Sequence, residues 1–403
     1  MPRYLTANFP GIGGTIKTSP EDFLVEELPL YPACGEGDHL YLEVEKRGLT
    51  TFELLKRLAC ALQVNERDMG YAGLKDAQAT TRQFISVPGC PEERALALDL
   101  DDIRILSARR HRNKLRLGHL AGNRFTITVR QVDHQAREKA LDILHVLQMA
   151  GVPNFFGEQR YGVLGNSHRI GQAIVRQNYA EAIAQIIGDP EKITNPDWQH
   201  AARLFCAGRL SEAVAALPRR MRHERDLITC LQQGACAEKA LRRLPAKLLR
   251  LYLSAYQSHL FDRLVTMRLD SLDTLWPGDL AYKHDNGACF LVTDPAAEQP
   301  RADRLEISPS APLFGYKVKL AESQAGILEQ ALLSKEAIDL KDFRIGTGLS
   351  MPGERRPLRI PVAEIDARQE SDQLILSFVL PKGCFATTVL REIMKTEQQH
   401  QAP

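Results

Sequence analysis

Residues Gly70-Tyr71-Ala72-Gly73-Leu74-Lys75-Asp76 lead into a segment of high β propensity that runs from Thr80 to Val87. Small residues followed by a Lys-Asp pair predict a tight turn between two extended segments. A carboxylate beside a cation on such a turn suits a reactive side chain, because loops on rigid scaffolds often carry function. The alternative is an ordinary solvated turn, since glycine and aspartate occupy turns for backbone reasons alone.

The regions on either side of this turn indicate a mixture of strands and helices. Residues 39–45 alternate between apolar and polar side chains, which is typical of a strand. The sequence Thr50-Thr51-Phe52-Glu53 has the form of a capping box, and the leucines behind it predict an amphipathic helix over 51–63. Further on, residues 125–130 predict a strand and residues 134–149 predict a helix.

The character of the chain then changes twice. From about 155 to 345 the pattern is mainly helical, and after Met351-Pro352-Gly353 extended character returns, with a strand at 374–378 and a helix at 386–395. This layout predicts one α+β domain interrupted by an inserted helical domain, and two tandem domains are the alternative. We expect the first domain to comprise 1–153 and 351–403, and the inserted domain to comprise 154–350. Within the inserted domain the periodicity predicts helices over 170–187, 201–216, 238–268 and 321–334, with extended pieces at 279–293.

Composition and cysteine spacing narrow the function classes. The 403 residues are 44% hydrophobic and 25% charged, as in ordinary globular proteins. No apolar run is long enough to span a bilayer and the N-terminus lacks the pattern of a secretion signal, so we expect a cytoplasmic location and no membrane. The eight cysteines match no metal-binding spacing, so we expect no metal.

Basic residues are concentrated locally although the net charge is only +2. One run contains Arg109, Arg110, Arg112 and Lys114 without an acidic residue among them. Local basic patches on a near-neutral protein suit contact with a polyanion such as the RNA backbone. A solvated surface explains such a run almost as well.

Seven motifs occur in order along nearly the whole chain, and together they resemble the TruD family of tRNA pseudouridine synthases. Each motif alone would be a weak signal, but their shared order makes accidental agreement improbable. They are Asp22-Phe23-Leu24-Val25-Glu26-Glu27, Gly37-Asp38-His39-Leu40, Gly73-Leu74-Lys75-Asp76, Gly122-Asn123-Arg124-Phe125, the segment from Pro153 to Gly162, Gln257-Ser258-His259-Leu260-Phe261, and Pro381-Lys382-Gly383-Cys384-Phe385-Ala386-Thr387.

The resemblance implies both a fold and an activity. The implied fold is α+β, a pseudouridine synthase catalytic domain with a mixed or antiparallel sheet and helices, interrupted by a mainly helical TRUD domain. The implied activity is isomerisation of a uridine in tRNA, most simply uridine 13, to pseudouridine. It implies Asp76 as the catalytic residue, tRNA as the partner, no cofactor and no obligate protein partner.

The resemblance also suggests roles around Asp76. Lys75 would support catalysis, since a nearby cation favours an ionised carboxylate, but adjacent residues can point to opposite faces and the turn geometry decides whether Lys75 reaches the site. The target base must leave its stack, and the resemblance places Phe23, Asn123, Phe125 and Phe385 at the pocket that receives it. For each phenylalanine, plain core packing is the alternative.

Two other functions are compatible with parts of the sequence. The first is a non-catalytic RNA-binding protein of the same fold, against which the intact Lys75-Asp76 pair argues. The second is a carboxylate hydrolase acting on small glycosides, which predicts a second acid paired with Asp76. Within the pseudouridine synthase reading, Asp76 could attack the ribose as a nucleophile or remove a ribose proton to form a glycal.

Overall fold

The chain forms two compact units. The computed structural model describes residues 3–77, 79–346 and 348–396. The first unit consists of Met1–Val152 and Ile360–Gln399, and the second is made chiefly of Pro153–Arg359. The chain therefore leaves the first unit and returns to it at Ile360, later than residue 351, where the sequence suggested the return. The roles assigned to the two parts from sequence stay predictions.

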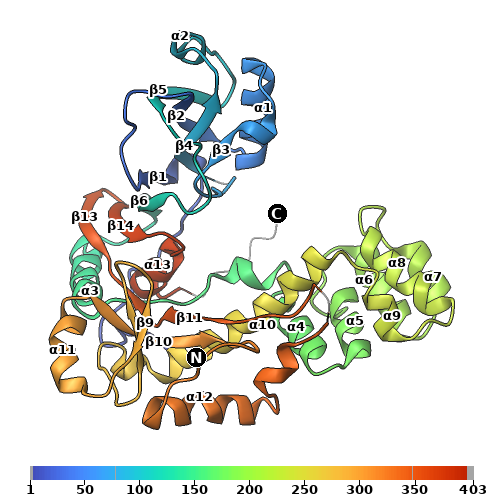
Figure 1. The fold of residues 1–403 in the computed structure, drawn as a ribbon. Helices are drawn as coiled ribbons and strands as arrows, with labels where there is room; N and C mark the ends of the chain where they lie inside the picture. The colour runs from blue at the N-terminus through green and yellow to red at the C-terminus, as the bar shows by residue number, and fades with distance from the viewer. Residues whose placement is uncertain (1–2, 78, 347, 397–403) are drawn as a thin grey trace. The chain divides into compact units, whose positions relative to one another are not determined.

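One eight-stranded sheet organises the first unit (Figure 1). Its order is β13-β14-β6-β1-β4-β2-β5, with β3 paired to β4. The pair β1 and β4 is parallel, whereas the other described pairs are antiparallel, so the sheet is mixed. The strands are β1 (Phe23–Pro29), β2 (His39–Arg47), β3 (Gly70–Tyr71), β4 (Thr80–Pro88), β5 (Ile103–His111), β6 (Leu120–Arg130), β13 (Ala363–Glu370) and β14 (Gln373–Pro381).

Four α-helices accompany this sheet: α1 (Thr51–Leu62), α2 (Glu92–Leu96), α3 (Ala136–Ala150) and α13 (Ala386–Met394). Helix α1 begins where the sequence predicts, because the Thr50 side chain accepts from the Glu53 backbone N–H and the Glu53 carboxylate accepts from the Thr50 N–H. Helix α1 ends at Gln63, whose φ of 56° places it in the left-handed region. Short 3-10 turns, Pro20–Asp22 and Glu66–Asp68, complete the connections.

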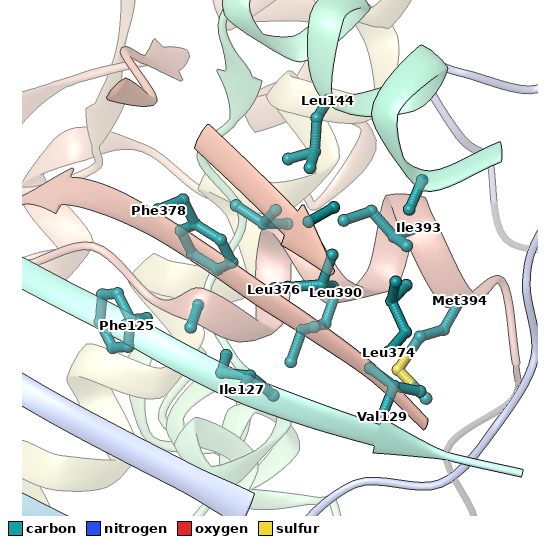
Figure 2. Packing of buried hydrophobic residues seen from close by; sticks show 14 of the residues in the cluster. Phe125, Ile127, Val129, Leu144, Leu374, Leu376, Phe378, Leu390, Ile393 and Met394 are labelled. Carbon is teal, nitrogen blue, oxygen red and sulfur yellow. The ribbon is translucent and has the colours of Figure 1, made fainter. Parts of the chain in front are cut away.

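Two hydrophobic cores lie against the same face of the sheet. In the first, β6 and β14 pair so that Phe125 lies opposite Phe378 and Ile127 opposite Leu376. Figure 2 shows these side chains packed with Leu390, Ile393 and Met394 of α13 and Leu144 of α3. The second core lies under α1 and includes Leu40, Leu42, Val44, Ile85 and Val87 of β2 and β4.

A strip of buried polar residues separates the two cores. The strand register places Lys46 opposite Thr81 and Thr81 beside Val25, and it places Glu27 opposite Asn123. Because directly paired residues share a face, these side chains lie on the same face as both cores. Lys46, Glu27 and Thr81 are buried although they are polar. Burying polar groups costs free energy unless they are hydrogen-bonded or paired, so these residues need polar partners.

The second unit is mainly helical. Its helices are α4 (Ser167–Val175), α5 (Tyr179–Ile187), α6 (Pro196–Cys206), α7 (Leu210–Ala216), α8 (Arg222–Gln232), α9 (Ala237–Leu241), α10 (Ala246–Met267), α11 (Pro295–Asp303) and α12 (Ser323–Lys335), with 3-10 turns at Glu158–Tyr161, Leu269–Ser271 and Leu340–Phe343. Helix α10 carries much of the packing, since Leu253, Tyr256, Leu260 and Phe261 are fully buried on it.

A small sheet completes the second unit. Its order is β11-β10-β8-β9, formed by β8 (Leu280–Lys283), β9 (Cys289–Leu291), β10 (Ile307–Leu313) and β11 (Glu354–Pro357). The two segments in which the chain passes between units, β7 (Val152–Pro153) and β12 (Arg359–Ile360), pair as a two-stranded sheet. A mixed sheet in the first unit and an antiparallel sheet in the second, together with the helices, confirm the predicted α+β class. No helix in the described ranges has the length and apolar character that crossing a membrane requires.

Candidate active site

The loop that carries Asp76 is held in place by its main chain. The N–H of Gly118 donates to the carbonyl of Ala72 at 2.8 Å, and the N–H of Lys75 donates to the hydroxyl of Thr51 at 2.9 Å. Thr51 is buried in the first turn of α1, and its hydroxyl in turn donates to Gln83 of β4 at 3.2 Å. Rigid elements on two sides therefore fix the approach to Asp76, as precise placement of a reactive group requires.

Lys17 forms an ion pair with the Asp76 carboxylate. Its Nζ lies 2.8 Å from Asp76 Oδ2, and the two side chains are 23% and 34% exposed. The same Nζ lies 4.8 Å from the centroid of the Phe23 ring, a cation–π distance. Lys17 has a φ of 58°, in the left-handed region that a lysine rarely adopts. Backbone strain of this kind often accompanies functional residues, and here it accompanies the ion pair with Asp76.

A second lysine hydrogen-bonds the backbone carbonyl of Asp76. Lys46, on β2, donates from Nζ to the Asp76 carbonyl at 3.0 Å and also to the Leu49 carbonyl. Burial lowers the pKa of Lys46 to about 8, while the negative charge of Asp76 opposes that shift. Lys46 therefore keeps its charge through neutral pH and adds positive potential near Asp76.

Lys75 points away from the Asp76 carboxylate into the polar strip. Its Nζ lies 3.1 Å from Glu27 Oε2, with side chains 5% and 1% exposed, and it donates to Asn123 Oδ1 at 2.5 Å. Burial raises the pKa of Glu27, and the Lys75 charge works against that rise. Because lysine can only donate, Asn123 must turn its oxygen toward Lys75 and its amide N–H₂ elsewhere. Lys75 therefore anchors the loop and orients Asn123.

The predicted phenylalanines differ in their environments. Phe23 and Phe125 are each 6% exposed and belong to the first core, with ring centroids 6.3 Å apart in an edge-to-face arrangement. Phe125 also packs on Phe378 at 5.7 Å. Phe385 is 41% exposed and precedes the first residue of α13. The burial of Phe23 and Phe125 agrees with the alternative that they simply pack in the core. Of the three predicted phenylalanines, Phe385 has the most accessible ring.

A chain of contacts connects five of the predicted residues. Asp76 contacts Lys17, Lys17 contacts Phe23, and Phe23 contacts Phe125. Asn123 lies two residues before Phe125 on the same face of β6 and bonds Lys75, which precedes Asp76. The structure thus gathers Asp76, Lys75, Phe23, Asn123 and Phe125 in one place, although they come from three segments of the sequence.

The predicted phosphate-binding residues lie on and after β5, at the edge of the sheet. Arg112 pairs with Glu36, and Arg110 lies 3.8 Å from Glu92. Lys114 donates to the carbonyl of Arg67 at 2.8 Å, and Arg109 is exposed. Exposed ion pairs contribute little to stability, so these cations can exchange their partners for phosphates at small cost. Their contact with RNA stays a prediction.

Sequence reasoning missed Lys17, Lys46, Glu27 and Thr51. The first three lie far from Asp76 in sequence, and nothing in the local pattern of Lys17 or Lys46 distinguishes them from other charged residues. Glu27 and Phe23 sit in the same quoted motif, so a period-2 reading of 23–27 would have placed both on one face. The sequence assigned Thr51 only to the start of a helix and gave no sign of its contact with the backbone N–H of Lys75.

Comparison with known proteins identifies relatives along the whole chain. The model of the family tRNA pseudouridine synthase D (TruD) matches residues 2–393. The chain is 75% identical over 397 residues to tRNA pseudouridine synthase D of Syntrophotalea carbinolica, covering 98% of this chain and 100% of the relative. It is 54% identical to tRNA pseudouridine synthase D of Geobacter metallireducens, with 98% of each covered. A crystal structure of a TruD protein from Methanosarcina mazei superposes with a TM-score of 0.85 at 29% identity, covering 98% of this chain and 96% of that one.

The mixed sheet and these relatives define an enzyme of the pseudouridine synthase class with the fold of that class. The predicted fold and the predicted class of enzyme are both confirmed. Within that class the chain belongs to the tRNA pseudouridine synthase D family.

Proposed function

We propose that this protein converts uridine 13 of tRNA to pseudouridine, and that Asp76 is its catalytic carboxylate. The observation that carries the proposal is the placement of Asp76. It is a partly exposed acid on an anchored loop, with the Lys17 ammonium 2.8 Å from its carboxylate and the Lys46 ammonium on its carbonyl. The relatives' names supply tRNA as the substrate, and a cytoplasmic location agrees with it.

The reaction needs an ionised acid next to the ribose of an extruded uridine. The C1′–N1 bond breaks, the base turns, and C1′ bonds to C5, while C5 loses a proton and N1 gains one. Asp76 either adds to C1′ or removes the proton on C2′, and Lys17 stabilises the ionised carboxylate that both routes require. The Phe23 ring lies beside Lys17, Phe125 supports that ring from the core, and Asn123 offers its amide N–H₂ to a uracil carbonyl.

Glu27 argues against hydrolysis by two carboxylates. A glycosidase needs a second acid that can reach the substrate or a water molecule. Glu27 is the acid tied to this loop through Lys75, and its side chain is 1% exposed and paired with that lysine. It is therefore suited to holding the loop and unsuited to protonating a leaving group.

The test is turnover of a tRNA by matched variants. Asp76→Asn is expected to abolish pseudouridine formation, read by a pseudouridine-specific chemical method, while the fold and RNA affinity persist. Asp99→Asn, an exposed acid of the same unit, is the control and keeps wild-type turnover. Residual turnover in Asp76→Asn would refute the catalytic role. Pseudouridine at a position other than 13 would refute the assigned target, and binding without turnover by the wild type would favour the non-catalytic RNA-binding protein.

A further inference from the structure

An aromatic ring lies exposed next to the Asp76 loop. Phe52 is 53% exposed at the second residue of α1, directly after Thr51, whose hydroxyl holds the N–H of Lys75. Leu74, two residues before Asp76, is 60% exposed. An exposed apolar side chain beside a site gains free energy when a ligand covers it, because burial removes its apolar surface from water.

Phe52 is held in position by its neighbours. Its ring centroid lies 6.2 Å from that of Tyr71, with the planes at 81°, an edge-to-face geometry. Tyr71 belongs to β3, which pairs with β4 and begins the loop that ends at Asp76. The capping box of Thr50 and Glu53 fixes the helical turn that carries the ring. Phe52 is therefore a rigid aromatic surface at a fixed place relative to the loop.

A nucleobase is the ligand that fits a rigid exposed ring beside a site for an extruded uridine. When a base leaves its stack, its neighbours lose a stacking partner, and aromatic side chains replace that partner in RNA-binding proteins. Lys56 follows Phe52 by one helical turn and is exposed, so it can meet the phosphate of the same nucleotide.

We propose that Phe52, supported by Tyr71 and flanked by Leu74, is a stacking platform for the nucleobase adjacent to the target uridine. The proposal rests on the proposed function, because it takes RNA as the ligand. It assigns Phe52 to positioning of the substrate. Asp76 and Lys17 remain the groups assigned to the reaction itself.

The first test compares RNA affinity among full-length variants that all carry Asp76→Asn, so that the RNA is not turned over. Adding Phe52→Ala is expected to raise Kd for a tRNA transcript about 5- to 100-fold, the range of one lost base–aromatic stack. Phe52→Trp is expected to keep the affinity. The control is Met149→Ala, which removes an even more exposed apolar side chain of the same unit, 73% exposed, and is expected to leave Kd unchanged. The salt dependence of Kd is expected to stay the same, since no phosphate contact is lost.

The second test removes the base instead of the ring. Transcripts with an abasic residue at position 12 or at position 14 are bound to the same variants. On the transcript that lacks the stacked base, Phe52→Ala is expected to cause no further increase in Kd. On the other transcript it is expected to raise Kd as much as on the intact RNA. The platform is refuted if the increases in Kd caused by Phe52→Ala and by the abasic residue multiply on both transcripts. It is also refuted if the Phe52→Ala variant binds the intact transcript as tightly as its parent. The ring would then serve another partner such as a protein.

These outcomes are separate from those for the proposed function. Turnover by the wild type and its loss in Asp76→Asn test the reaction, whereas the coupling between Phe52 and an abasic position is a binding result. If the product carries pseudouridine at another position, position 13 is refuted as the target. The platform would then be tested, with the same expected coupling, on transcripts abasic on either side of that uridine.

Discussion

Lys75 and Asp76 are neighbours in sequence, yet they perform different tasks in the folded protein. The Lys75 side chain enters the polar strip and pairs with Glu27, while the Asp76 carboxylate contacts Lys17 near the surface. A turn sends consecutive side chains in different directions, so adjacency in sequence did not mean a shared contact. The sequence identified both residues but could not decide the direction of Lys75.

Removing the Lys75 charge is expected to destabilise the protein in a pH-dependent way. In Lys75→Met, Glu27 remains buried without its cation. We expect the free energy of unfolding to fall by roughly 3–5 kcal/mol near pH 8. Burial already raises the pKa of Glu27, and loss of the cation raises it further. An acid with a raised folded-state pKa contributes stability that is complete below its unfolded pKa and is lost as pH rises through the folded one. The deficit relative to wild type is therefore smaller at pH 5 than at pH 8.

Urea unfolding of wild type and Lys75→Met at both pH values measures this difference. Adding Glu27→Leu to Lys75→Met is expected to recover most of the stability, because no unpaired charge remains buried. Turnover is expected to stay low in the double variant, since Asn123 has still lost the donor that orients it. An equal deficit at both pH values would show that the ion pair is not its source.

Lys17 is expected to affect turnover more than stability. Its ion pair with Asp76 is partly exposed, so Lys17→Met costs at most about 1 kcal/mol of folding free energy. Loss of the cation beside the reacting carboxylate is expected to lower kcat about 10- to 100-fold with a smaller change in KM. Lys17→Arg keeps the charge and is expected to restore part of kcat. A variant in which KM rises and kcat is unchanged would instead assign Lys17 to RNA binding.

At the level of elements, the Asp76 loop depends on a close backbone approach at its start. A Cβ on Gly70 would overlap the Leu115 carbonyl and lie 2.6 Å from Ser86 Oγ. The Leu115 N–H donates to the same Ser86 hydroxyl at 3.0 Å, so neither group can move freely. Gly70 is therefore required by packing between β3 and the segment before β6.

Gly70→Ala and Gly73→Ala form a matched pair for this requirement. Gly70→Ala is expected to cost about 1–3 kcal/mol, the usual range for overpacking, and more if the strand pairing is lost. At Gly73 the nearest atoms to an added Cβ lie 4.0 Å away, so Gly73→Ala is expected to change stability by less than about 1 kcal/mol. Denaturant midpoints of the two variants give the comparison, and similar midpoints would contradict it.

Elements with a local signal were predictable from the sequence, whereas elements fixed by distant contacts were not. The capping box and leucine spacing gave α1, and the predictions of helices over 134–149 and 386–395 agree with α3 and α13 within two residues at each end. By contrast, the expected helices over 170–187, 201–216 and 238–268 are each divided into two, and α8, α11 and β10 were missed. Helix α11 and strand β10 contain prolines, which reduce the local signal for helix or strand, and tertiary packing supplies the rest.

At the scale of the whole molecule, the first unit depends on both ends of the chain. Strand β14, from the C-terminal part, pairs with β6 along nine residue pairs from Gln373↔Arg130 to Pro381↔Gly122. Helix α13 completes the core on the same face. The order of strand-rich, helical and strand-rich sequence indicated such an interrupted domain, because strands that lie apart in sequence can still share one sheet. It could not give the pairing partner or register of β14.

Half-buried histidines are expected to make the second unit sensitive to acid. Burial lowers the pKa of His284 to about 4 and that of His168 to about 4. A base with a lowered folded-state pKa contributes stability that is present above its unfolded pKa, near 6.5, and is lost as pH falls toward the folded value. The unit is therefore expected to lose stability between about pH 6.5 and pH 4.

Tryptophan fluorescence can follow this unit selectively, because Trp198 and Trp276 are the only tryptophans and both lie in it. In His284→Gln the unfolding midpoint is expected to be lower at pH 7, since the bond between His284 Nε2 and Ser308 Oγ at 2.8 Å is disturbed. The fall of the midpoint with decreasing pH is expected to be less steep than in wild type but not abolished, because burial also lowers the pKa values of His168 and His259. His200→Gln alters an exposed histidine and is expected to keep the wild-type slope. An unchanged slope in His284→Gln would mean that other groups set the acid sensitivity of the unit.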